Sequence, residues 1–197
     1  NDAPELTLID DQVINEDTSL VLTLSATDID GDDLTYDSGV TGNATVSVVG
    51  DQLTVDAYDD FNGDIQVTVF VSDGDLSDSH TFTLTVDPTN DIPIIDAVPD
   101  QQMNEDTILE VALFGNDIDV GDVLTFSVDV TDNAAVSVDG NILTIDSDSN
   151  YNGSLSITVS VSDDLESVSA NFSVTVNPVN DAPELTLIDD QVINEDT

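Results

Sequence analysis

The sequence predicts an all-β protein built from tandem Greek-key sandwiches, and three observations lead to this prediction. The chain of 197 residues repeats itself at intervals of 89 and 90 residues. Within each repeat, apolar residues alternate with polar ones in short runs, and Gly, Asn and Asp separate these runs. A period of two is typical of strands with one buried face, and no window has a helical period with caps.

The repeat begins with a segment that occurs three times. Residues 1–18 (NDAPELTLIDDQVINEDT) recur unchanged at 180–197, and a divergent copy occupies 90–107. Self-similarity at a fixed period is the signature of a repeated structural unit. We therefore expect a first repeat over 1–89, a second over 90–179, and the opening strand of a third, incomplete repeat over 180–197.

Each repeat is expected to contain about seven short strands, the number typical of a sandwich of this size. Alternation is clearest where Ile65, Val67, Val69 and Val71 share one face. Phe82 and its counterpart Phe172 are expected in the two cores. In the first repeat we expect strands near 5–14, 19–27, 33–37, 44–49, 52–56, 65–72 and 79–87.

The charge of the chain excludes several functions. It has 43 Asp and Glu residues but no Lys and no Arg, which gives a formal charge of −43. A protein without basic side chains cannot neutralise phosphates, so neither nucleic acids nor anionic membranes are expected partners. Because 39% of the residues are hydrophobic and lie in patterned runs, we expect a folded acidic protein rather than a disordered tail.

Many acidic residues gather where the predicted strands end. Asp28 and Asp30 follow the second strand, Asp73 follows the sixth, and Glu16 ends the first. Loops that meet at one end of a sandwich could supply the six to eight oxygen ligands of Ca²⁺, whereas Mg²⁺ needs a tighter octahedron. An EF-hand is excluded, because Asp33 stands where that motif requires glycine.

The sequence resembles the bacterial cadherin-like tandem repeats of large surface adhesins. The resemblance extends over the whole chain and implies a cadherin- or Ig-like sandwich, with successive repeats forming an elongated rod. The motifs that carry it are Asn-Glu-Asp-Thr at 15–18 and 104–107, Thr-Asp-Ile-Asp-Gly at 27–31, Phe-Asn-Gly at 61–63, Val-Ser-Asp-Gly at 71–74, and Asn-Asp-x-Pro at 90–93 and 180–183.

In that family Ca²⁺ lies between successive repeats, and the resemblance implies three sets of ligands here. The complete junction would use Glu16, Asp60, Asn90, Asp91, Asp117, Asp119 and Asp163. A partial C-terminal junction would use Glu105, Asn180 and Asp181. A partial N-terminal junction would use Asn1, Asp2, Asp28, Asp30 and Asp73. The chain departs from the family pattern at the second junction, where Ser149 and Asn150 replace the loop acids.

No enzymatic function is expected. The single histidine, His80, is expected at the surface, and its counterpart is Ala170. The chain has no Cys or Lys to serve as a nucleophile. The resemblance implies instead a Ca²⁺-rigidified extender of a secreted or surface-anchored bacterial adhesin, whose partners are the neighbouring repeats. Two alternatives remain open: a Ca²⁺-dependent module that binds polysaccharide, and a homophilic adhesion module.

Overall fold

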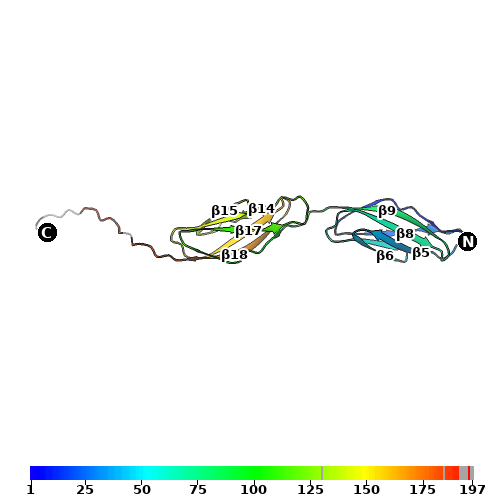
Figure 1. Cartoon of the computed structure of the whole chain (residues 1–197), viewed down its shortest axis with the longest axis horizontal. Helices are drawn as coiled ribbons and strands as arrows, with labels where there is room; N and C mark the ends of the chain where they lie inside the picture. Colours follow the sequence, from blue (N-terminus) through cyan, green and yellow to red (C-terminus); the bar gives the residue numbers. More distant parts are fainter. Residues whose placement is uncertain (130, 184, 191–194, 196–197) are drawn as a thin grey trace. The chain divides into compact units, whose positions relative to one another are not determined.

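The computed structural model describes residues 1–129, 131–183, 185–190 and 195, and the chain divides into two compact units, Asn1–Asn90 and Asp91–Thr197. Each unit is a sandwich of strands (Figure 1), and the described residues include no helix. This confirms the all-β prediction. Accordingly, nothing in the described part of the chain has the length and apolar character of a membrane-spanning helix.

Unit 1 contains nine strand segments in two main sheets. One sheet has the order β2-β9-β8-β5 and the other β3-β7-β6, while β1 pairs with β4. Every pairing is antiparallel except that of β2 with β9, which is parallel. The segments are β1 (Glu5–Leu6), β2 (Gln12–Asn15), β3 (Ser19–Thr23), β4 (Ala26–Thr27), β5 (Thr35–Thr41), β6 (Ala44–Val49), β7 (Gln52–Ala57), β8 (Gly63–Ser72) and β9 (Ser77–Asp87).

Unit 2 repeats this topology, with sheets β11-β18-β17-β14 and β12-β16-β15 and the pair β10-β13. Its long hairpin of β17 and β18 corresponds to β8 and β9 (Figure 1). The segments are β10 (Ile94–Ile95), β11 (Gln101–Asn104), β12 (Ile108–Ala112), β13 (Gly115–Asn116), β14 (Thr125–Val128), β15 (Ala134–Asp139), β16 (Ile142–Ser147), β17 (Gly153–Ser162) and β18 (Ser167–Asn177).

The opening strand expected over 5–14 is two segments, because the chain changes sheets between them. Glu5 and Leu6 pair with β4, whereas Gln12–Asn15 pairs with β9 and so belongs to the four-stranded sheet. His80 was expected at the surface but is half-buried, and its Nε2 lies 3.0 Å from the carbonyl oxygen of Ile9 in this crossing. The strand expected over 19–27 is likewise interrupted between Thr23 and Ala26.

Each unit has its own apolar core on the inner faces of its sheets. In unit 1 the predicted face of β8, Ile65 to Val71 at every second residue, is fully buried. Phe82 and Phe172 are 2% and 5% exposed, which confirms that both belong to the cores. Residues 180–183 and 185–190 carry no strand and are exposed. The opening strand expected over 180–197 therefore stays a prediction, and 184, 191–194, 196 and 197 lie outside the described residues.

Candidate metal centres

At the N-terminal end of unit 1, the loop after β4 is folded around the carboxylate of Asp28. Its Oδ1 accepts hydrogen bonds from the backbone N–H groups of Asp30 (2.8 Å), Gly31 (2.9 Å) and Asp32 (3.3 Å). Gly31 has a φ of 80°, which glycine adopts without steric cost. The turn brings carboxylate oxygens of Asp28, Asp30 and Asp32 within 4.8 Å of one another.

The second oxygen of Asp28 is in an unfavourable position. Asp28 Oδ2 is buried and has no hydrogen-bond partner. Burying a carboxylate oxygen without a partner costs free energy, and the chain has no Lys or Arg to compensate it. A cation bound between Asp28 and its neighbours would supply the missing partner.

Asp73, which follows β8, lies at the same end of the unit. Its Oδ1 accepts hydrogen bonds from the N–H groups of Leu76 and Asp75, both at 2.7 Å, and its Oδ2 accepts one from Asn1 Nδ2 at 2.9 Å. The N–H groups of Leu76 and Asp75 hold the pKa of Asp73 below its ordinary value.

Asp2 joins the same group through its backbone. Its N–H donates to Asp30 Oδ2 at 2.7 Å. The structure thus gathers all five residues expected at the N-terminal half-site, which are Asn1, Asp2, Asp28, Asp30 and Asp73.

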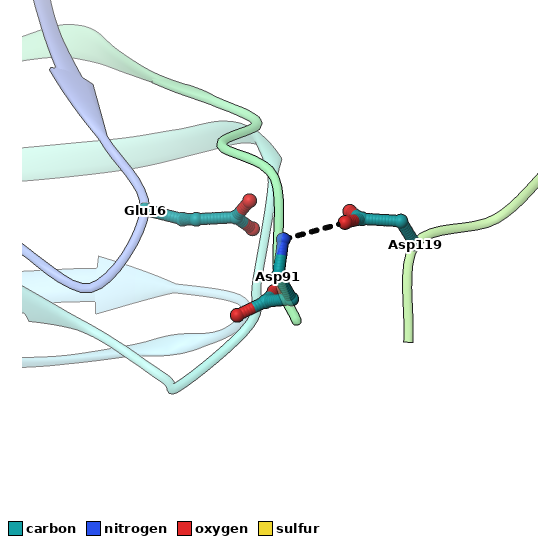
Figure 2. A group of neighbouring side chains, drawn as sticks. All are labelled: Glu16, Asp91 and Asp119. Carbon is teal, nitrogen blue, oxygen red and sulfur yellow. Dashed lines mark hydrogen bonds between the residues drawn. The ribbon is translucent and has the colours of Figure 1, made fainter. Parts of the chain in front are cut away.

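Unit 2 builds the same arrangement from the equivalent residues. The N–H of Asp91 donates to Asp119 Oδ2 at 2.8 Å (Figure 2), and the N–H of Asp119 donates to Asp117 Oδ1 at 3.0 Å. Asp117 Oδ2, like Asp28 Oδ2, is buried without a hydrogen-bond partner. Asp163 is 7% exposed, and its Oδ1 accepts from the N–H groups of Leu165 and Glu166.

Asp122 was not among the expected ligands, yet it belongs to this loop. Carboxylate oxygens of Asp117, Asp119 and Asp122 lie within 4.8 Å of one another. Loss of hydration, followed by the negative charges of Asp119, Asp117 and Asp163, raises the pKa of Asp122 above its ordinary value. Repulsion of this kind is what a bound divalent cation would relieve.

At the C-terminal end of unit 1, Glu16 is held against the last strand. It is drawn in Figure 2 and is only 3% exposed. Its backbone N–H donates to the carbonyl of Asp87 at 2.9 Å, while its Oε1 accepts from the N–H of Thr89 at 2.5 Å. Asn62 Nδ2 donates to the other carboxylate oxygen, Oε2, at 3.3 Å. These neutral donors fix the direction of the carboxylate without neutralising its charge.

Unit 2 holds Glu105 in the same way. It is 4% exposed and accepts from the N–H of Val179 at 2.6 Å and from Asn152 Nδ2 at 3.3 Å. Asn180 and Asp181 come directly after Val179 and are exposed, and Asn180 Nδ2 donates to the carbonyl of Asp181 at 3.1 Å. Asn90, the last residue of unit 1, is exposed as well.

Asp17 is a residue of this end that the sequence interpretation did not single out. It has a φ of 58°, and its Oδ1 accepts a hydrogen bond from the N–H of Asp60 at 3.2 Å. Carboxylate oxygens of Asp17 and Asp60 lie within 4.8 Å of each other. In unit 2 the equivalent hydrogen bond runs from the N–H of Asn150 to Asp106 Oδ1, and its length is also 3.2 Å. The recurrence of Asp within Asn-Glu-Asp-Thr is the signal that could have indicated it.

Comparison with known proteins bears on the family and the fold of the chain. A family model described as "Bacterial Ig domain" matches residues 1–86 and again residues 90–177. No curated protein matches the chain.

Solved structures share the fold at low sequence identity. Human protocadherin-24 EC1-2 is 17% identical with a TM-score of 0.59, covering 91% of this chain and 100% of that chain. Drosophila N-cadherin EC1-4 is 15% identical with a TM-score of 0.55, covering 91% and 50% respectively. An endo-fucoidan hydrolase of glycoside hydrolase family 107 is 20% identical, but its TM-score is 0.37 and this chain spans 29% of its length. The likeness to the two cadherin structures concerns the fold alone.

Proposed function

This chain belongs to the bacterial Ig domain family, and we propose that its two repeats form a Ca²⁺-rigidified extender of a large extracellular bacterial adhesin. The observation that carries the proposal is the buried, unpartnered oxygen that recurs in both repeats, Asp28 Oδ2 and Asp117 Oδ2. The chain has no Lys or Arg side chain that could neutralise it. The nearby possible ligands are oxygens of other carboxylates, which suit Ca²⁺.

The proposed junction site takes ligands from the end of the first repeat and the start of the second. Glu16 and Asp60 would contribute from one side, and Asp117, Asp119 and Asp163 from the other, with Asn90 and Asp91 in the connection. Support comes from each unit taken alone, because backbone N–H groups already orient Glu16, Asp119 and Asp163. Ca²⁺ would stiffen the connection by cancelling the repulsion among these carboxylates.

Calorimetric titration tests the proposal directly. The chain is expected to bind Ca²⁺ more tightly than Mg²⁺, because the loops offer flexible oxygen ligands rather than a compact octahedron. Equal affinities for the two ions, or no binding of Ca²⁺, would contradict the proposal.

A pair of variants tests the assignment of residues. Asp119→Ala removes a proposed ligand, whereas Asp96→Ala removes an exposed carboxylate that follows β10. Both variants lose one negative charge. A difference in their Ca²⁺ affinities therefore arises from a local contact and not from the net charge. Ca²⁺ affinity is expected to fall in Asp119→Ala and to stay near that of the parent in Asp96→Ala. Equal affinities for the two variants would refute the assignment.

The role as an extender is tested by the state of association. An extender that acts as a spacer should remain monomeric with Ca²⁺, as sedimentation would show. Dimers that form only with Ca²⁺ would favour the homophilic module instead.

A further inference from the structure

Phe70 places an apolar ring on an outer face of the β8–β9 hairpin whose other side chains are polar. It lies on β8, where Ile65, Val67, Val69 and Val71 point into the core and the alternate residues point outward. Phe70 is 42% exposed. The neighbouring outward positions of this hairpin hold Gln66, Thr68, Ser72, Ser77, Ser79 and Thr81.

A hollow lies beside the ring. Its volume is about 400 Å³, and the residues that line it include Thr35, Tyr36, Asp37, Phe70, Ser72 and Ser77. Asp37 lies directly opposite Phe70 in the register of β5 and β8, and Ser79 lies opposite it on β9. Ligand sites of proteins commonly occupy about 300–1,000 Å³ and combine aromatic surface with a few polar groups.

Unit 2 shows that the fold does not require an aromatic residue here. In its register Ser160 takes the place of Phe70, between Ser127 on β14 and Ser169 on β18. The hydroxyl oxygens of Ser160 and Ser169 are 2.9 Å apart and hydrogen-bonded to each other. Phe70 and Asp37 therefore distinguish the first repeat from the second at a position where either residue type is compatible with the sandwich.

We propose that this hollow on unit 1 binds a neutral saccharide, with Phe70 as the stacking surface and Asp37 as a hydrogen-bond acceptor. The apolar C–H face of a sugar ring packs on an aromatic ring, and its hydroxyl groups donate to carboxylate and hydroxyl oxygens. Asp37 Oδ1 accepts from the N–H of Ser38 at 2.8 Å, which holds the carboxylate at the rim. The formal charge of −43 disfavours acidic glycans, so the ligand is an uncharged hexose polymer.

The two repeats supply matched variants for the test. Phe70→Ser and Asp37→Ser each introduce the residue that unit 2 carries at the equivalent position. Phe114, which is 59% exposed in unit 2, corresponds to Ser25 of unit 1, so Phe114→Ser is an equivalent loss of an exposed ring elsewhere. All three exchanges concern exposed side chains, and circular dichroism checks that each variant is folded.

The experiment is affinity electrophoresis of the full chain through gels that contain a neutral β-glucan, α-mannan or galactan, with alginate as the acidic polymer and chitosan as the cationic one. At least one neutral polymer is expected to retard the parent chain. Phe70→Ser should weaken that binding by about tenfold or more, Asp37→Ser should weaken it as well, and Phe114→Ser should leave it unchanged. No retardation by any neutral polymer, retardation by chitosan alone, or equal retardation of Phe70→Ser and the parent would overturn the proposal.

Discussion

Asp117 is held in its turn by one oxygen, while the other is buried without a partner. The first oxygen accepts the N–H of Asp119, so the turn needs an acceptor at that position but does not need a charge. Asp28 repeats the arrangement in unit 1. At both positions a side chain that folds the loop also leaves a negative charge with too little hydration, and this is the feature that a cation would satisfy.

The variant Asp117→Asn separates these two roles. Asn keeps an acceptor for the N–H of Asp119 and removes the charge. Without metal, the free energy of unfolding should be equal to that of the parent or higher, whereas affinity for Ca²⁺ should fall. Urea denaturation in EDTA and calorimetric titration measure the two quantities, with Asp96→Asn as the control of equal charge. A variant that loses stability in EDTA and keeps its Ca²⁺ affinity would refute this interpretation.

Asp78 predicts how the metal-free protein responds to acid. The N–H groups of Leu6 and then Ser79 hold its pKa below the ordinary value of 3.8. Since the folded-state pKa is lowered, the stabilisation is present above the pKa of the unfolded chain and is lost as the pH falls through the folded-state value. Asp78→Asn should therefore be less stable than the parent at pH 7, and the difference should shrink below pH 3.8.

The measurement is urea denaturation in EDTA across this pH range, with the exposed Asp96→Asn as the control. A difference between Asp78→Asn and the parent that stays constant with pH would contradict the assignment.

Residues of the candidate sites could be predicted from the sequence where an acidic motif lies within a single loop. Asp28, Asp30 and Asp73 were predicted in this way and lie together. Asp17 was not, because its contact with Asp60 joins two loops that are distant in sequence. Asp122 was missed for a different reason: an acidic residue in an acidic loop has no distinguishing pattern, and only the turn brings it to Asp117.

Among the elements, the strands that could be predicted are those that remain in one sheet. The runs expected at 44–49, 52–56 and 65–72 are observed as β6, β7 and β8 with small changes of boundary. The opening run was predicted as one strand because alternation records which side chains are buried and not which sheet they join. The strand expected at 33–37 extends to Thr41 through Gly39, a residue that usually weakens a strand.

The hairpin of β17 and β18 supplies a prediction about the core. Ile157 is fully buried on β17, and its neighbour Ser156 points to the opposite face. Ile157→Ala should lower the free energy of unfolding by about 2–5 kcal/mol through lost burial and a residual cavity. Ser156→Ala, one residue away, should change it by about 0.5 kcal/mol or less. Chemical denaturation of both variants is the measurement, and comparable losses would contradict the assigned faces.

For the whole molecule, the repeat explains why the same loops carry carboxylates in both units. One end of each unit carries an Asp-x-Asp pair together with the Asp that follows the long strand β8 or β17. The opposite end of each unit carries a buried Glu, which is Glu16 or Glu105. The sequence could predict these two ends from the period alone, because the period places the same motif in each copy. The register of the repeats also predicted that Asn150 replaces Asp60, and the structure agrees, because both residues have a backbone φ of 57°.

The central claim is that Ca²⁺ stabilises this chain by binding specific loops rather than by screening its charge. The most direct test is thermal unfolding, together with small-angle scattering, in Ca²⁺ and in EDTA at equal ionic strength. A site filled to 100 times its dissociation constant adds about 2.7 kcal/mol, which corresponds to a rise in melting temperature of about 11–22 °C for a domain of this size. We expect that rise and a change in the radius of gyration. A melting temperature and a radius of gyration that are the same in Ca²⁺ and in EDTA would contradict the claim.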